Sequence, residues 1–321
     1  LVKLGTISLD GTKIKANASK HKALSWEYAN RLEAQLKQEV EDLMRLAEEA
    51  DQCSRPEEMD IPEELKRREE RLAAIARAKE EIQARAQERF EREQAEFEAK
   101  QAKREAHEKE TGKKPRGKPP KPPTSGPQAK DQVNLTDEES RIMPTASGGF
   151  EQAYNAQAGV DVKTHLIVEQ HVTQRTNDKQ EIEPALEAIG HLPKALGEAE
   201  NLLADTGYFS NANVEKCTKA SLVPFIPEKR EKHNLPLTER FREDPEPHRN
   251  TTAVQAMQHR LQTREGKAVY ATRKSTVETV FGVIKHVLEF RQFLLRGLDS
   301  VQSEWSLVCI GWNLKRMHAL R

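Results

Sequence analysis

The sequence predicts an α/β fold that is interrupted near its start by a long helical segment. Short apolar runs typical of strands occur near the N-terminus and again beyond residue 150, where they alternate with helical patterns. Between these regions, residues 23–111 repeat their apolar side chains at three- and four-residue steps, which is a helical spacing. Charged residues make up 32% of the chain and the mean hydropathy is −0.82. This is too polar for one compact globule, so we expect exposed helix or linker as well.

The first segment, residues 1–22, is expected to supply the first strand or strands of the core. Its β-like run ends at Asp10-Gly11, because Asp-Gly is a strong turn signal. A second short strand is expected at Lys13–Ala16. The chain begins almost inside a strand and without an initiator Met, so we expect that upstream sequence is missing.

Residues 23–111 are expected to form a helical hairpin. One amphipathic helix begins at Ala23, Pro56 and Pro62 break it, and a second helix follows from about residue 63 to 110, capped by Ser54 or Asp60. The dense charge pattern favours a solvated coiled-coil arm, and an arm that contacts DNA or dimerises is the alternative. The sequence does not reveal the function of this hairpin.

Residues 112–140 are expected to be a disordered linker, because the stretch KKPRGKPPKPPTSGPQAK is rich in Pro and Lys and cannot bury a core. A solubilising linker is favoured over one that touches DNA phosphates. The remainder of the core, residues 141–321, is expected to contain four strands and five helices. The strands are expected at 153–162, 165–172, 202–204 and 222–226, and the helices at 182–192, 210–220, 251–264, 270–290 and 301–320.

Net charge, cysteine spacing and the length of apolar stretches bear on the class of protein. The formal net charge is zero, but local basic patches can still bind phosphate. Three cysteines without CxxC spacing argue against a disulfide framework or a zinc site, and they fit a reducing compartment. No apolar stretch approaches the roughly 20 residues of a membrane span, so we expect no membrane association.

Three acidic residues are candidates for chemistry. Asp10 and Asp205 each end a predicted strand, where sites of α/β folds gather, although taken alone each is better explained as a turn residue. Glu278 lies on a strongly apolar helix, where a carboxylate is costly unless it is paired or bound to a cation. An exposed ion pair between Glu278 and Lys285 at the edge of the apolar stripe is the alternative.

Four segments give these residues a common context. The sequence resembles insertion-sequence DDE transposases with a YREK signature. The resemblance spans nearly the whole chain except the helical hairpin and linker, and the tail from Arg291 also fits that group. The matching segments, in order, are LDGTKIKANASKHK from Leu9, GFEQAYNAQAGVD from Gly149, ADTGYFS from Ala204 and YATRKSTVETVFGVIK from Tyr270.

One departure from the signature concerns its glutamate. Four residues, not three, separate Arg273 from Glu278. Val277 occupies the strict position and cannot ligate a metal, so Glu278 is the candidate, and it keeps the six-residue gap to Lys285.

The resemblance implies a ribonuclease-H-like mixed sheet with flanking helices, interrupted after the first strand or strands by the hairpin and linker. In such a core the first Asp lies on the first strand, the second Asp follows the fourth strand, and the Glu lies on a later helix. Asp10, Asp205 and Glu278 match these positions as catalytic and metal-binding residues. Three carboxylates suit Mg²⁺ or Mn²⁺, here as two ions. The DNA-binding residues are then Tyr270, Arg273, Lys285, Lys13 and Lys15, whose alternatives are ion pairs, a core-edge aromatic and a solvated strand face.

The expected function is metal-dependent DNA cleavage at the ends of the element and strand transfer into target DNA. The expected partners are double-stranded DNA, both terminal repeats and target, and a second copy of the chain in the active complex, in the cytoplasm at the nucleoid. Two alternatives remain open. One is an inactive, truncated remnant that at most binds DNA or assembles through its coiled coil, and the other is a related metal-dependent nuclease.

Overall fold

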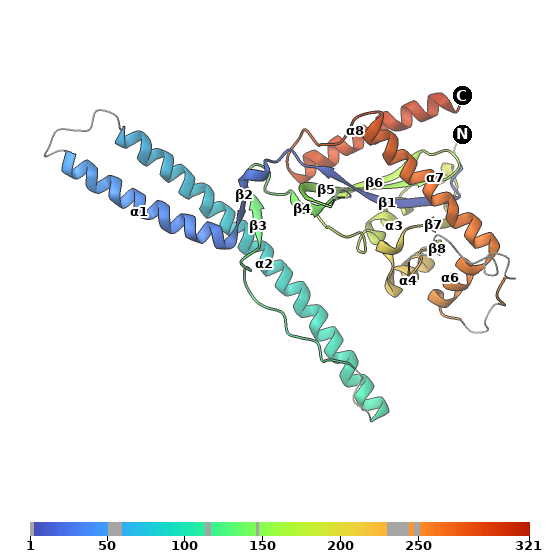
Figure 1. The fold of residues 1–321 in the computed structure, drawn as a ribbon. Coiled ribbons are helices and arrows are strands. Elements are labelled where there is room, and N and C mark those ends of the chain that lie inside the picture. The colour runs from blue at the N-terminus through green and yellow to red at the C-terminus, as the bar shows by residue number, and fades with distance from the viewer. Residues whose placement is uncertain (1–2, 51–59, 113–116, 146–147, 230–243, 247–250) are drawn as a thin grey trace. The chain divides into compact units, whose positions relative to one another are not determined.

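A computed structural model describes residues 3–50, 60–112, 117–145, 148–229, 244–246 and 251–321 of the chain. It divides into two compact units, drawn in Figure 1. The first, called the core unit, comprises Leu1–Ala18 and Glu139–Arg321, and the second, called the hairpin unit, comprises Ser19–Glu138. Among the described residues, no helix has both the length and the apolar character that crossing a membrane requires.

A six-stranded mixed sheet forms the centre of the core unit. Its path runs β4-β5-β1-β7-β8, and β6 pairs with β5 as well. β1 is antiparallel to β5 and parallel to β7, and β7 is parallel to β8. The strands are β1 (Thr6–Lys15), β4 (Arg141–Pro144), β5 (Phe150–Asp161), β6 (Ile167–Thr173), β7 (Asn201–Leu203) and β8 (Val223–Phe225). The expected α/β fold with a mixed sheet is therefore confirmed.

Helices cover both faces of this sheet (Figure 1). They are α3 (Ile182–Gly190), α4 (Asn211–Lys219), α6 (Ala253–Gln262), α7 (Arg264–His286) and α8 (Leu298–Ala319), with the 3-10 turns η2 (Lys194–Leu196) and η3 (Thr206–Tyr208). One apolar core packs α7 and α8, with Trp305 of α8, against side chains on one face of the sheet that include Ile14 and Tyr154. A second joins α3, α4 and α6 to the opposite face, including Leu9 and Leu202. Strand side chains alternate between faces, so the sheet contributes to both cores.

The prediction of a turn at Asp10-Gly11 was wrong. β1 continues through both residues, and its register with β5 runs from Ile7 opposite Asp161 to Lys15 opposite Ala153. The ladder hydrogen bonds of the long β5 outweigh a local turn preference. Asp10 therefore lies within a strand and not at its end, and the separate strand expected at residues 13–16 is the second half of β1.

Two further boundaries differ from expectation. β4 was not anticipated, because its four residues carry little pattern of their own and their pairing partner is the start of β5. α7 begins at Arg264, six residues before the predicted start, because the Thr263 hydroxyl accepts a hydrogen bond from the N–H of Gly266 and caps the helix.

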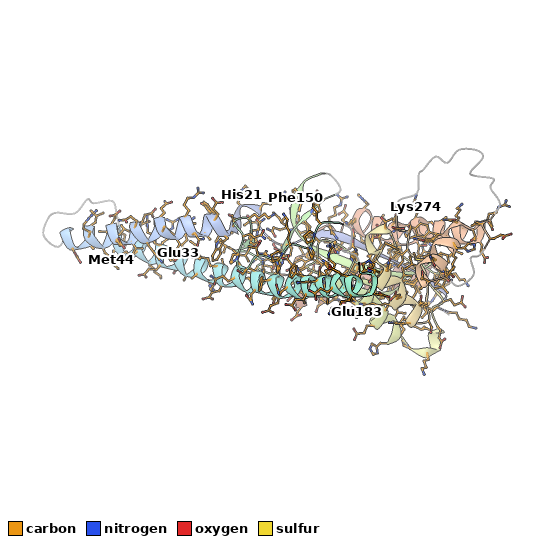
Figure 2. All side chains as sticks on the ribbon, turned by 90° about the horizontal axis from the view of Figure 1, so that it is seen from below. His21, Glu33, Met44, Phe150, Glu183 and Lys274 are labelled. Atoms are coloured by element: carbon orange, nitrogen blue, oxygen red, sulfur yellow. The ribbon has the colours of Figure 1, made fainter. Side chains whose placement is uncertain are left out.

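The hairpin unit contains η1 (Lys20–Lys22), β2 (Ala23–Ser25), α1 (Trp26–Ala50), α2 (Ile61–Thr111) and β3 (Gln132–Asn134). The helices pack through a small apolar cluster that includes Leu36, Ile75 and Ile82. The two helices are also joined by an ion pair, in which Nζ of Lys79 on α2 lies 2.6 Å from Oε2 of Glu33 on α1 (Glu33 is labelled in Figure 2). As predicted, Asp60 caps α2, accepting from the N–H of Glu63.

The start of α1 and the expected linker also need correction. Residues 23–25, expected to be helical, form β2, and β2 pairs antiparallel with β3, which lies inside the stretch expected to be a linker. Leu24 and Val133 lie opposite each other in this small sheet, and both are buried in the apolar cluster of the hairpin unit, which explains the pairing. The predicted breaker Pro56, the alternative cap Ser54 and Cys53 lie outside the described residues.

Candidate active site

The parallel register of β1 and β7 brings two of the three candidate carboxylates together. Ser8 pairs with Leu203, and the same offset continued by two residues places Asp10 level with Asp205. Neighbouring strands lie about 4.8 Å apart. Asp205 lies two residues beyond the end of β7, and its carboxylate accepts a 2.7 Å hydrogen bond from the N–H of Gly207, which caps η3. Asp205 is thereby held where β7 ends, beside the middle of β1.

α7 brings the third carboxylate to the same region. Tyr270 packs against the core on one face of the sheet and Val277 is buried in the core on the other, so the helix is fixed on both sides of Arg273. The guanidinium of Arg273 bonds Asp10 Oδ2 through Nη1 at 3.0 Å and Glu278 Oε1 through Nη2 at 2.9 Å. These three side chains are 11%, 19% and 47% exposed, in the order Arg273, Asp10, Glu278. A largely buried cation thus joins the first and third candidate carboxylates.

The surroundings of Asp10 disfavour the ionised form of its carboxyl group. Burial is the largest cause and raises the pKa of its carboxyl to about 6, the charge of Arg273 lowers it, and the charge of Asp205 raises it again. The pKa of Arg273 is raised above its ordinary value, because the neighbouring acidic groups, Asp10 foremost, outweigh the effect of its burial. Additional positive charge beside Asp10 and Asp205 would therefore be favourable.

A second polar group lies beside β1. Asp178, in the loop between β6 and α3, accepts hydrogen bonds from Asn155 Nδ2 at 2.6 Å and Gln157 Nε2 at 2.7 Å. Lys13 Nζ lies 3.4 Å from the same carboxylate oxygen. Tyr208 of η3 is buried and donates its hydroxyl hydrogen to Gln157 Oε1. We call these five residues the Asp178 network, and the negative charge of Asp178 also raises the pKa of Asp10.

Gly11 is what allows this network to approach the strand. A Cβ on Gly11 would collide with Gln157 Nε2 and would lie 2.6 Å from Asp178 Oδ1 and 2.8 Å from Asn155 Oδ1. The absence of a side chain next to Asp10 therefore makes room for polar groups of β5 and of the loop before α3.

The remaining predicted site residues have different surroundings. Lys285 donates from Nζ to the backbone carbonyl of Lys13 at 2.9 Å, and its burial lowers its pKa. It is thus tied to β1 and does not pair with Glu278, whose partner is Arg273. Lys15 is exposed at the end of β1. Lys274, labelled in Figure 2, is also exposed, although it follows the inward-turned Arg273 directly.

Sequence reasoning missed the Asp178 network, but a signal for part of it existed. Along the buried β5, Tyr154, Ala156 and Ala158 point into one apolar core, while the alternate positions carry the buried polar residues Asn155 and Gln157. Buried polar side chains need partners, so polar residues repeating every second position in an apolar strand indicate a polar network. The loop sequence around Asp178 carries no comparable signal that Asp178 belongs to this network.

The donor set can be compared with what a divalent cation requires. Among the residues that the structure describes, no group of three or more His, Cys, Asp or Glu side chains stands ready to hold a metal ion. Asp10 and Asp205 are close, and their hard oxygen atoms suit Mg²⁺ or Mn²⁺. Glu278 is joined to Asp10 through Arg273, so a positive charge already lies between two of the three carboxylates.

Comparison with known families adds one finding. A family model described as a transposase DDE domain matches residues 214–318. The match supports a DDE transposase. It runs from α4 into α8 and includes Arg273 and Glu278 of α7, whereas Asp10 and Asp205 lie outside it. No curated protein and no solved structure matches the chain.

The carboxyl group of Asp10 should titrate near pH 6. Folding raises the pKa of this carboxyl, so ionising it in the folded protein lowers the free energy of unfolding. The loss develops as the pH rises from about 4 to 6 and amounts to about 3 kcal/mol above pH 6. Asp205→Asn should lower the midpoint, because it removes a neighbouring negative charge. Carboxyl ¹³C NMR on aspartate-labelled protein, with Asp10→Asn for assignment, measures it. Glu265→Gln, on an exposed position of α7, is the control. A wild-type midpoint near 4 would contradict the account.

Gly11→Ala should destabilise the core unit by about 1–3 kcal/mol, because the new methyl group displaces buried, hydrogen-bonded side chains. Gly5→Ala is the matched control, since a Cβ there meets nothing within 4 Å, and its effect should stay within about 0.5 kcal/mol. Urea unfolding measures both. Equal stability of the two variants would mean that the Asp178 network does not depend on Gly11.

Proposed function

We propose that this chain is a DDE transposase whose catalytic carboxylates are Asp10, Asp205 and Glu278. The observation that carries the proposal is the Arg273 bridge, which links Asp10 on β1 to Glu278 on the helix that the transposase family model covers. The position of Asp205 just beyond β7, the strand that runs parallel to β1 and beside it, supports the proposal. The three residues lie 195 and 73 positions apart in sequence, so only the fold brings them to one region.

A ribonuclease-H-like core is part of the proposal. If β1, β5, β6, β7 and β8 are counted as the core strands, Asp10 lies on the first, Asp205 follows the fourth, and Glu278 lies on a later helix. This is the placement that the resemblance implies. The hairpin unit then enters after the first core strand and leaves before the second.

We further propose that the three carboxylates hold Mg²⁺ or Mn²⁺, as two ions. The donor chemistry fits, and the raised pKa of Asp10 indicates a place where added positive charge relieves repulsion. When bound, such ions activate the attacking oxygen and neutralise charge on the leaving oxygen. Cleavage at an element end and joining to target DNA both displace one oxygen from phosphorus by another, so one site serves both reactions.

The cationic side chains of the site are proposed to neutralise the carboxylates and to bind DNA phosphates, and neither role needs a metal. Arg273 neutralises Asp10 and Glu278 while DNA is absent, and its planar guanidinium can bind a phosphate through two N–H groups. Lys285 and Lys13 place positive charge along β1, and Tyr270 and Lys15 complete the proposed DNA contacts. The proposed substrates are the terminal repeats of the element and target DNA at the nucleoid, bound by a homodimer.

Glu278→Gln should abolish Mg²⁺-dependent cleavage of terminal-repeat DNA, with a loss on the order of 10³-fold or more, because the amide cannot supply the negative charge. Glu265→Gln, an exposed glutamate on the same helix, should cleave like the wild type. Gel analysis of end-labelled DNA reports nicks and strand-transfer products separately, and a binding assay without Mg²⁺ should give similar affinity for both variants.

The outcomes of this assay discriminate between the functions. Undiminished cleavage by Glu278→Gln would reject the catalytic assignment. Nicks without strand-transfer products would indicate a nuclease, and specific binding without cleavage by the wild type would indicate a DNA-binding remnant.

A further inference from the structure

Helix α8 is apolar on two opposite sides, although only one of them packs against the core unit. Its inner side buries Val301, Trp305, Cys309 and Trp312 against the sheet. Its outer side carries four large apolar side chains that remain exposed. These are Leu307, Ile310, Leu314 and Met317, with exposed fractions of 69%, 53%, 63% and 53%, and we call them the outer face of α8. A helix that is hydrophobic all round is normally buried, so half of α8 lacks its expected cover.

The spacing within the outer face is that of a helix seam. Leu307, Ile310, Leu314 and Met317 follow one another at steps of three, four and three residues, which are the a and d positions of a heptad. Such a seam complements an identical seam, because its side chains insert between those of a second helix. The pattern therefore specifies a helix as the partner, and a second copy of α8 satisfies it without any further sequence requirement.

The charges beside this seam are compatible with pairing of identical surfaces. The positions that flank Leu307, Ile310 and Leu314 on this side of the helix are Ser306, Gly311 and Asn313, which carry no charge. The Asn313 side chain is already bonded to the backbone of Ile167. A two-fold interface places a surface against its own copy, so a charged rim of one sign would repel, and residues 306–314 of α8 carry no charge.

The area is also sufficient. The four side chains expose roughly 500 Å² per copy, at the upper end of the apolar patches that monomers carry. If they are fully covered, two copies would together bury about 1,000 Å², which reaches the lower limit for a specific interface. From the spacing, the uncharged rim and the area, we infer that the outer face of α8 is the homodimer interface of this protein. The inference depends on α8 alone and not on the proposed chemistry.

Analytical ultracentrifugation of the full chain tests this inference. The wild type should dimerise with rising concentration, and Leu307→Glu with Leu314→Glu should raise the dimer dissociation constant roughly a hundredfold or more, because four charged groups enter the paired seam. Circular dichroism should be unchanged, since both leucines are exposed. Leu307→Ala with Leu314→Ala should give a smaller increase and keeps the test valid if the charged variant misfolds.

The matched control introduces the same charges at exposed apolar residues outside α8. Val287 and Phe150 are 60% and 64% exposed, and Val287→Glu with Phe150→Glu should dimerise like the wild type (Phe150 is labelled in Figure 2). A monomeric wild type would overturn the inference, as would dimers that persist in both α8 variants. Because the readout is mass and not DNA cleavage, its failure is distinguishable from failure of the proposed function.

Discussion

The buried charge of Asp10 is the constraint on which the site depends. A carboxylate in the middle of a strand, beside Asp205 and near the Asp178 network, is unfavourable unless positive charge is close. Arg273 supplies that charge in the structure, and it does so from a helix that both apolar cores hold in place. The position of α7, the register of β1 against β7 and the burial of Arg273 are thus parts of one electrostatic arrangement. In the proposed function, bound cations would take the place of this guanidinium beside the carboxylates, and a DNA phosphate would become its new partner.

A helical insertion of over a hundred residues between β1 and the rest of the core unit is compatible with this arrangement. The hairpin unit begins and ends close to its own small sheet, where Ala23 pairs with Asn134 and Ser25 with Gln132. The two ends of the insertion are therefore held near each other by backbone hydrogen bonds. Because loop length adds only slowly to the entropy of closure, a long insertion closed in this way costs the core little.

Much of this molecule is predictable from its sequence, and the failures have local causes. The α/β class, most elements and the cap at Asp60 follow from periodicity and capping residues, because these signals are contained within each element. The strand through Asp10-Gly11 was missed because its stability comes from β5, more than 140 residues away, and not from its own turn-forming dipeptide. The Arg273 bridge and the role of Asp178 were missed for the same reason, since each pairs residues that are distant in sequence. Asp10, Asp205 and Glu278 themselves are proposed as site residues through resemblance and not through their individual chemistry.

Mn²⁺ binding to the full chain, measured by electron paramagnetic resonance, tests the central claim most directly, because it asks whether three separate carboxylates form one cation site. The wild type is compared with Asp10→Asn, Asp205→Asn, Glu278→Gln and the control Glu265→Gln. The account predicts that each of the first three substitutions weakens Mn²⁺ binding and that the control does not, since it lies on the same helix but outside the site. Unchanged Mn²⁺ affinity in all three site variants would contradict it.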